Sequence, residues 1–590
     1  MIVPMKKVFI ITQNKDVNQA TKALRSLGVV HVENQQAPKG TDIASIQEDL
    51  DLIDRAITIL SEPGLKTPGR FTKIKILRDW KFAARYITDL RSRLDQLEEF
   101  SRNISIRISQ WEAWGDFDPA TIHSLREKGI RIKLYLIPVK ELEKLPSDIV
   151  VREIFRSGGA VGCVVISRKD IDIPFKEMAL PAMSLKAMKA RLEKDGAAIK
   201  KLRAELAKCA RYHDRFMRIQ KAFEKELELH QAAHGMAQSG TLSYLAGYVP
   251  FDQVQAVTDA ARREKWGIVT RDPAEEDEVP TLVRNPRWIS IIEPVFKFLE
   301  VIPGYKELDI SPLFLLFLSL FFGMIIGDAG YGALYIALTA FIQIKLGDKA
   351  KDKRIFFLLY LFSASAVMWG ILTGTIFGQE WYAAAGFKPL IPVLNDMKVL
   401  QALCFFIGAF HLTLGHGWQA IRKLPSITAL ADMGWILVLW AAFFLARMLI
   451  LGYALPAVAK WLIISGVVLV IFCSSPQRNI LKAVASGLGT VALSIMNNFT
   501  DVVSYIRLFA VGLAGVAISD TVNSLAASVG QDAPLAKPFI LLAGHTLNIV
   551  LGPISVLVHG VRLNVLEFSS HVGLSWSGRP YKPLKKEAVS

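Results

Sequence analysis

The first 300 residues alternate between short strands of alternating polarity and long amphipathic helices. Alternating residues at Lys7–Thr12 and Val29–Glu33 flank a helix-compatible stretch, so this region predicts a strand–helix–strand unit. Further strand candidates occur at Ile130–Ile137, Ala160–Ile166 and Leu242–Val249. These segments predict two small α/β lobes within a domain that covers residues 1–300.

Two helical stretches, at about 80–112 and 183–235, lie between these strands. Apolar residues recur at the first and fourth heptad positions, most regularly from Leu185 to Leu227. We expect the two helices to fold back on each other as an antiparallel coiled-coil stalk, in which about 45 residues would extend roughly 65 Å. On the pattern alone, two amphipathic helices packed in one compact domain remain the alternative.

From Pro312 onward the chain is largely apolar, in blocks long enough to cross a bilayer. The blocks cover residues 312–344, 355–378, 398–421, 430–451, 456–473, 490–528 and 538–571. Basic residues gather in alternate connections, at Lys345–Arg354, Arg422–Lys423, Arg478–Lys482 and Arg579–Lys586. By the positive-inside rule these connections are predicted to be cytoplasmic.

The first apolar block must then cross the membrane an even number of times, if the N-terminal domain is cytoplasmic too. Two short helices turning around Gly327–Gly332 satisfy this condition, although each is shorter than the usual ~20 residues. The last two blocks exceed what a perpendicular helix needs, so we expect them to be tilted. The prediction is about eight transmembrane helices in residues 301–590, with both termini cytoplasmic and the protein in the cell membrane.

Composition agrees with this division of the chain. The 590 residues are 52% hydrophobic and have a net charge of +16. Residues 1–300 hold 49 basic and 41 acidic residues, whereas residues 301–590 hold 21 and 13. These values exclude a disordered chain, a small secreted scaffold and a single soluble domain.

Several kinds of chemistry are not expected in this chain. Its four cysteines match neither a disulfide framework nor a zinc spacing, and His411 and His416 do not share a helix face, so no metal and no cofactor are predicted. No Gly-Lys dipeptide occurs, so an ATP site with a phosphate-binding loop is absent. Acidic and basic residues are interleaved along the helices, which argues against nucleic-acid binding. The N-terminus does not resemble a signal peptide.

The last two blocks contain charges within apolar sequence, where they need a partner or an aqueous cavity. Thr500, Ser504 and Arg507 share one helix face, because they are four and three residues apart. A permanently charged guanidinium on such a face could attract a carboxylate of another helix and favour its ionised form. An internal ion pair of Arg507 with Glu567 or Asp501 is an equally good interpretation of the residues alone.

Four stretches resemble subunit I (subunit a) of the rotary V-type and archaeal A-type ATPases. They are Ile302–Pro312, Phe322–Gly332, Asp501–Ala510 and His559–Asn564. Their order and spacing, with the lobe–stalk–lobe plan and the eight spans, extend the resemblance over nearly the whole chain.

The resemblance implies a non-catalytic stator subunit of an ATP-driven pump or synthase. In that family a rotor ring of small proteolipid subunits, each with an essential carboxylate, rotates past the two long tilted helices. Arg507 matches the arginine that faces this carboxylate, promotes release of the ion and keeps two aqueous half-channels apart. Arg562 matches a supporting second arginine, and His559 occupies a polar position in the same channel. The cytoplasmic rod matches the part that links the motor to peripheral stalks, and so to the central rotor and catalytic head.

One departure from the family concerns the half-channel. Eukaryotic members have a glutamate about three turns before the second arginine, where this chain has Gly552 followed by Pro553. The path on that side must use other groups, and the candidates are His545, Asn548, Glu567 or water. The full set of predicted ion-translocation residues is Asp501, Ser504, Arg507, His545, Asn548, His559, Arg562 and Glu567.

The sequence therefore predicts a multidomain protein with two parts. N-terminal α/β lobes on an antiparallel coiled-coil stalk precede an all-α polytopic membrane domain with two long tilted C-terminal helices. The resemblance implies that it translocates H⁺ or Na⁺ against a rotor ring, in contact with the lipid bilayer. The competing hypothesis is a self-contained secondary transporter that uses the intramembrane arginines for an anionic substrate, and a third is a purely structural anchor.

Overall fold

The computed structural model describes most of the chain. The described residues are 1–62, 79–144, 149–169, 173–175, 177–348, 350, 352–378, 389–474, 480–529 and 535–586. Contacts divide the chain into two compact units, one of residues 1–11, 26–32 and 246–590 and the other of residues 12–25 and 33–245. The predicted domain boundary near residue 300 stays a prediction.

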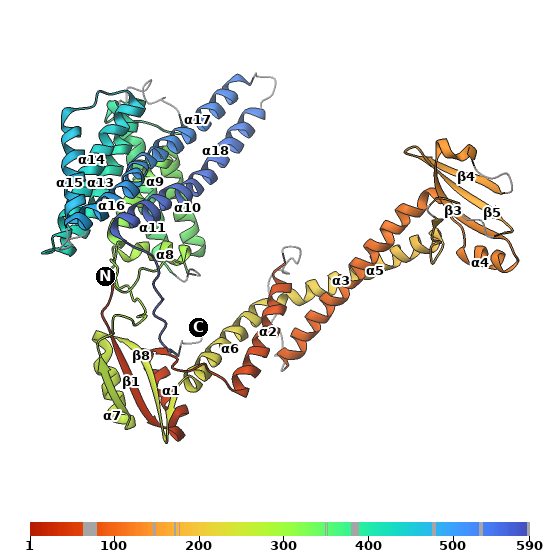
Figure 1. The fold of residues 1–590 in the computed structure, drawn as a ribbon, viewed down its shortest axis with the longest axis horizontal. Helices are drawn as coiled ribbons and strands as arrows, with labels where there is room; N and C mark the ends of the chain where they lie inside the picture. The colour runs from red at the N-terminus through yellow and green to blue at the C-terminus, as the bar shows by residue number, and fades with distance from the viewer. Residues whose placement is uncertain are drawn as a thin grey trace. The chain divides into compact units, whose positions relative to one another are not determined.

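Paired helices dominate the unit of residues 12–25 and 33–245. Helix α3 (Trp80–Trp111) packs against α5 (Leu185–Cys209), and α2 (Thr41–Leu60) packs against α6 (His213–His234) (Figure 1). A single 3₁₀ turn, Ala210–Tyr212, separates α5 from α6. The structure thus shows paired helices where a coiled-coil stalk is predicted. Helix α2 was not predicted, although apolar residues recur in it at heptad spacing from Ile43 to Leu60.

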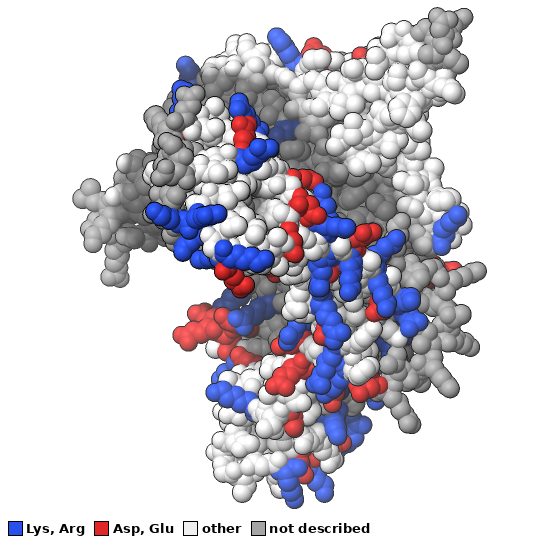
Figure 2. All heavy atoms as spheres, turned by 90° about the vertical axis from the view of Figure 1, so that its right-hand side faces the viewer, with Lys and Arg blue, Asp and Glu red and all other residues white. Residues whose placement is uncertain are grey.

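Apolar and charged side chains both hold these helices together. Leu90 and Leu94 of α3 are buried in one cluster with Leu206 of α5. At the surface, Arg203 of α5 pairs with Glu98 of α3 at 2.8 Å. Figure 2 shows Lys and Arg intermixed with Asp and Glu on the charged part of the face that it presents. Such exposed pairs add little to stability, so the buried seam accounts for most of the packing.

The same unit contains an antiparallel sheet of four strands in the order β4-β5-β3-β6. The strands are β3 (Arg131–Pro138), β4 (Val150–Ser157), β5 (Ala160–Ser167) and β6 (Glu177–Met178), accompanied by α4 (Pro119–Glu127). Tyr135 and Val161 face a common buried cluster, as the alternating pattern of both strands requires.

A second sheet has strand order β2-β8-β1-β9, and β7 pairs with β8. Its elements are β1 (Met5–Gln13), β2 (His31–Glu33), β7 (Ala237–Ser239), β8 (Leu242–Pro250) and β9 (Gly267–Arg271), with α1 (Val17–Leu27) and α7 (Val254–Glu264). The C-terminal segment returns to this lobe, because the amide of Leu584 donates to the carbonyl of Val30 at 2.9 Å.

Residues 293–572 form a bundle of mainly apolar helices. They are α8 (Glu293–Leu299), α9 (Ser311–Ile326), α10 (Ala329–Leu346), α11 (Arg354–Thr373), α13 (Met397–Lys423), α14 (Thr428–Leu451), α15 (Ala457–Cys473), α16 (Ile480–Ser504), α17 (Ile506–Ser528), α18 (Ala536–Ser555) and α19 (Ser569–Val572). Among the described residues, six helical segments are long and apolar enough to cross a membrane, and α9 and α15 are shorter apolar helices. The chain is therefore a multi-pass membrane protein, and the count of eight spans stays a prediction.

The first apolar block breaks into two helices at Gly327 and Asp328. Gly327 adopts a positive φ of 65°, which ends α9. Asp328 caps α10, since its carboxylate accepts hydrogen bonds from the amides of Tyr331 at 3.0 Å and Gly378 at 2.8 Å. This arrangement gives Asp328 a structural role at the turn.

The last helix of the bundle is irregular. After α18, the chain continues through two π-helical turns, η8 (Val556–Gly560) and η9 (Leu563–Phe568), before α19. The irregular stretch follows Pro553, which lacks the amide that the preceding turn needs. The wider turns place Glu567 on the side facing α17, where it contacts Arg507, and bring Arg562 close to the same carboxylate. Single π-turns within helices are frequent at functional sites.

Candidate functional site

Arg507, Arg562 and Glu567 meet in one ion cluster. Arg507 lies in the first turn of α17, where its Nη2 donates to Oε1 of Glu567 in η9. Nε of Arg562 lies 3.4 Å from the same oxygen. Glu567 is 6% exposed and Arg507 is half-buried, whereas the Arg562 side chain is 55% exposed. One buried carboxylate is thus shared by two arginines, which leaves a net positive charge.

The sequence left open an internal ion pair of Arg507 with Glu567 or Asp501, and in the structure the partner is Glu567. This ion pair does not use up the hydrogen-bonding capacity of the cluster. Among the described residues Oε2 of Glu567 is buried without a hydrogen-bond partner. Because an unsatisfied buried carboxylate oxygen is costly, this oxygen is a place for water or a further donor.

Two hydrogen bonds connect Arg507, through Ser504, to the backbone of Asp501, which precedes it in the chain. Nε of Arg507 donates to the carbonyl of Ser504 at 2.9 Å, and Oγ of Ser504 donates to the carbonyl of Asp501 at 2.7 Å. The Ser504 hydroxyl is therefore bonded to its own helix, which fixes the turn between α16 and α17. The side chain of Asp501 points elsewhere, to His571.

A continuous series of ionisable side chains leads away from Asp501. Oδ2 of Asp501 lies 3.0 Å from Nε2 of His571, and Nδ1 of His571 lies 2.8 Å from Nε2 of His416. Nδ1 of His416 lies 3.6 Å from Asp432, which pairs with Lys423 at 2.8 Å. His571, His416 and Asp432 are each less than a tenth exposed. We call Asp501, His571, His416, Asp432 and Lys423 the Lys423-side network.

A separate polar cluster contains His545 and Asn548 of α18. Nδ1 of His545 lies 2.6 Å from the hydroxyl of Tyr331, which lies 2.8 Å from Oγ of Ser519. Nδ2 of Asn548 donates to the same Oγ at 2.8 Å. Nε2 of His545 lies 3.1 Å from Oδ1 of Asn523, and Asn523 donates in turn to the carbonyl of Phe377 at 2.8 Å. We call Tyr331, Ser519, Asn523, His545 and Asn548 the His545 cluster.

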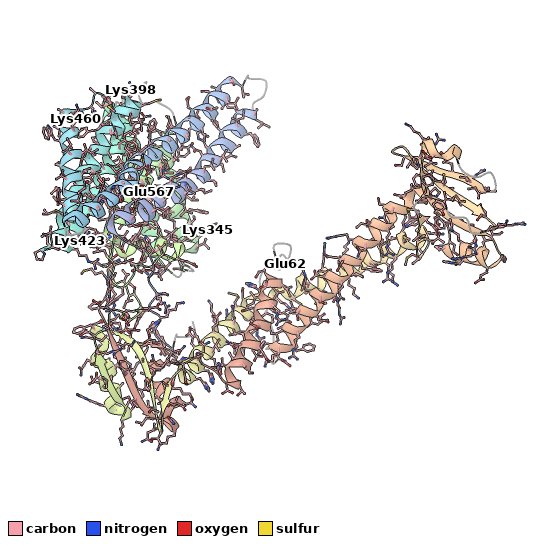
Figure 3. The ribbon with its side chains drawn as sticks, viewed as in Figure 1. Glu62, Lys345, Lys398, Lys423, Lys460 and Glu567 are labelled. Atoms are coloured by element: carbon pink, nitrogen blue, oxygen red, sulfur yellow. The ribbon has the colours of Figure 1, made fainter. Side chains whose placement is uncertain are left out.

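The ion cluster and the His545 cluster contact different stretches of α17, at Arg507 and at Ser519. Ser519 follows Arg507 by twelve residues, which corresponds to about 18 Å along a helix. Figure 3 places Glu567 between the end of the bundle that holds Lys345 and Lys423 and the end that holds Lys398 and Lys460. Helix α11 starts at Arg354, near the Lys345 end, so the Phe377 contact lies toward the opposite end. The ion cluster is thus situated between two polar groups that lead to opposite ends.

His559 and His411 belong to neither group within the described part of the chain. His559 is half-buried, one turn before Arg562. His411 is fully buried between the rings of Phe317 and Phe568, with centroid separations of 3.7 and 4.1 Å, and its Nδ1 lies 2.9 Å from the hydroxyl of Tyr505. These contacts indicate a packing role for His411.

Sequence reasoning missed the residues that extend the site. His416, Asp432 and His571 come from α13, α14 and α19, and only the packing of these helices brings them together. Two signals were available in the apolar sequence, Asp432 in α14 and His416 in α13, and His416 was considered only as a metal ligand.

Known proteins are similar to this chain over nearly its whole length. No family model matches the chain. It is 32% identical over 638 residues to "V-type ATP synthase subunit I 1" of Treponema pallidum, in an alignment covering 99% of this chain and 100% of that protein. The chain belongs to the V-type and A-type ATP synthase subunit I family.

Other members of the subunit I family are similar over most of their length. "V-type ATP synthase subunit I" of Borreliella burgdorferi is 30% identical, with 99% of this chain and 100% of that protein covered. "A-type ATP synthase subunit I" of Methanocaldococcus jannaschii is 24% identical over 78% of this chain and 70% of that protein. A crystal structure of the cytoplasmic N-terminal domain of a subunit I covers 45% of this chain and 100% of that domain, at 15% identity and a TM-score of 0.26.

Gly552, where this subunit I departs from the eukaryotic pattern, lies in a tight place. A Cβ atom there would lie 2.6 Å from Cδ1 of Ile326 and 3.1 Å from the hydroxyl of Tyr335. A larger side chain therefore fits only if Ile326 and Tyr335 move. Asn548, one turn earlier on α18, instead supplies a polar group of the His545 cluster.

Proposed function

We propose that this subunit is the stator of a rotary ATPase and forms two ion half-channels against the rotor ring. The observation that supports this most strongly is the Arg507–Glu567–Arg562 cluster between two polar networks. An ion that entered along one network would reach the ring close to Arg507, and would leave along the other after the ring had turned.

The Lys423-side network is suited to moving protons. Two imidazoles in hydrogen-bond contact lie between the carboxylates of Asp501 and Asp432, so each imidazole can accept a proton from one neighbour and pass it to the next. Two imidazoles in direct contact are poor ligands for Na⁺, which prefers oxygen. We therefore favour H⁺ as the ion, with the His545 cluster supplying the second half-channel.

Arg507 separates the two paths. Its charge repels a cation passing directly from one network to the other, and guanidinium stays charged where a buried lysine could lose its proton. A carboxylate of the ring that approached Arg507 would compete with Glu567 for the guanidinium. That exchange would favour the ionised ring carboxylate and so promote ion release.

The surface of α17 and α18 fits a ring partner. The segment Ala536–Val572 is 11% buried in its most apolar window, the lowest share among the six candidate spans. Phe539 and Leu542 are 71% and 70% exposed. Rotor proteolipids and the lipid bilayer would cover this face. The paired helices of residues 33–245 would contact the peripheral stalks, which connect to the catalytic head and central rotor.

The orientation follows from the basic connections. Lys345 and Lys423 lie at one end of the bundle and Lys398 and Lys460 at the other (Figure 3). The first pair belongs to the connections rich in Lys and Arg, so we place that end in the cytoplasm, together with both termini.

The test compares the purified chain with the assembled complex, each reconstituted into liposomes with a pH-sensitive dye inside. The stator function predicts ATP-driven proton flux only in the assembled complex, and no solute-coupled flux from the chain alone. Transport of an anion by the chain alone would instead support a self-contained secondary transporter.

A further inference from the structure

A group of metal-ligating side chains lies far from the membrane site, between α2 and α6. His230 and His234 are four residues apart on α6, and Asp42 lies in the first turn of α2. Their ligand atoms all lie within 4.8 Å of one another. Figure 1 shows α2 and α6 side by side, as their contacts require.

We propose that Asp42, His230 and His234 bind a divalent transition-metal ion of the Zn²⁺ class. Two histidines at this spacing present their imidazoles on one helix face, and a carboxylate from a second helix supplies the third ligand. In a tetrahedral site with bonds of about 2.0–2.1 Å, ligand atoms are separated by about 3.3 Å. Small rotations of the three side chains from their present positions would reach that geometry.

The backbone around the three residues is already held in place. Nε2 of Gln36 donates to the carbonyls of His234 at 3.1 Å and Met236 at 2.7 Å, and the amide of Gln35 donates to the carbonyl of Gly235 at 3.0 Å. These bonds fasten the segment before α2 to the end of α6. The first turn of α2 is thereby kept close to both histidines without a metal.

The chemistry of the ligands and their access to solvent restrict which metal ion can bind. Imidazole nitrogen with one carboxylate suits Zn²⁺, Ni²⁺ or Cu²⁺ better than Mg²⁺ or Ca²⁺, which prefer oxygen ligands. Asp42 and His234 are exposed, so an ion can enter from solvent and keep a water molecule as a fourth ligand. The bound ion would join the start of α2 to the end of α6.

The test measures Zn²⁺ binding to the full chain in detergent, by competition with a chromophoric chelator. We expect the native chain to bind one equivalent at micromolar Zn²⁺, and the His230→Gln/His234→Gln double variant to bind at least about 10-fold more weakly. His123→Gln, which changes an exposed histidine on α4, serves as the matched control and should bind like the native chain.

Thermal unfolding provides a second measurement. Zn²⁺ should raise the unfolding temperature of the native chain and of His123→Gln, and leave that of the double variant unchanged. Because His234 is exposed and His230 is only half-buried, the double variant should have the native far-ultraviolet circular dichroism. Equal Zn²⁺ affinity in the native chain and the double variant, or no uptake by the native chain at micromolar Zn²⁺, would overturn the proposal.

Discussion

Arg507 and Glu567 form an ion pair between α17 and the π-helical turn η9, sixty residues apart in the chain. Glu567 is also the partner of Arg562 at 3.4 Å, so both arginines depend on one buried carboxylate. The pair joins the two helices proposed to face the rotor ring. The contribution of this ion pair to the free energy of unfolding can therefore be measured on the isolated chain.

The Glu567→Gln substitution should destabilise the isolated chain more than Arg562→Gln. Loss of the carboxylate leaves the half-buried Arg507 unpaired, which costs about 3 kcal/mol. Arg562 is 55% exposed, so its removal should cost less than about 1 kcal/mol. Denaturant unfolding of both variants in the same detergent measures the difference. Equal losses would show that Glu567 is not the centre of the cluster.

His571→Gln should reduce ATP-driven proton pumping by at least about 10-fold while the complex still assembles. Glutamine can form hydrogen bonds but cannot pass a proton between Asp501 and His416. Thr413→Ala is the matched control, because Thr413 lies on α13 three residues before His416 and its hydroxyl donates to the carbonyl of Ala409 in its own helix. Normal pumping by His571→Gln would remove the Lys423-side network from the proton path.

Gly512→Ala should lower the free energy of unfolding by about 1–3 kcal/mol. A Cβ at residue 512 would lie 2.6 Å from the carbonyl oxygen of Met324, so α17 would have to move from α9. At Gly515 the nearest atom is 3.7 Å away, and Gly515→Ala should change stability by no more than about 1 kcal/mol. Denaturant unfolding of the two variants tests whether α17 approaches α9 closely at Gly512. Equal stabilities of the two variants would contradict that close approach.

Glu307 should give the chain a pH-dependent link between the start of the bundle and the C-terminal segment. Burial raises the pKa of Glu307, but hydrogen bonds from Ser575, Gly304 and Trp576 outweigh it, so the pKa lies below its ordinary value. A lowered pKa stabilises the fold above the unfolded-state value of 4.5, and this stabilisation is lost as pH falls through the folded-state value.

The Glu307→Gln variant tests this link through unfolding temperatures measured from pH 7 to pH 3. The variant should be less stable than the native chain at pH 7, and the difference should shrink progressively below pH 4.5. A difference that stays constant over this range would exclude the carboxylate as its cause.

Structural features that depend on residues close together in the chain could be predicted from the sequence. The break at Gly327 and Asp328 follows from one positive φ and one helix cap, both of which short motifs reveal. Charges in apolar sequence pointed to Arg507 and Glu567. The sequence could not choose between Glu567 and Asp501 as the partner of Arg507, because that choice depends on the π-helical turns after Pro553.

Features that require several helices to meet were not predictable in this way. His571 lies in a four-residue helix that packs against α13, and it meets Asp501 of α16 only through that packing. Helix α2 has apolar residues at heptad spacing, from Ile43 to Leu60, but which helix it packs against appears only once α2 and α6 are folded. Asp42 and His230 are likewise distant in sequence, and only this packing brings them together.

The most direct test of the stator function is Arg507→Ala in the assembled complex, with ATP-driven proton pumping and ATP hydrolysis measured on the same preparation. Arg447→Ala, in the apolar helix α14, is the matched control for loss of an arginine. We predict that Arg507→Ala assembles but pumps at least about 100-fold less, whereas Arg447→Ala pumps normally when assembled. Unchanged pumping by Arg507→Ala would contradict the proposed mechanism.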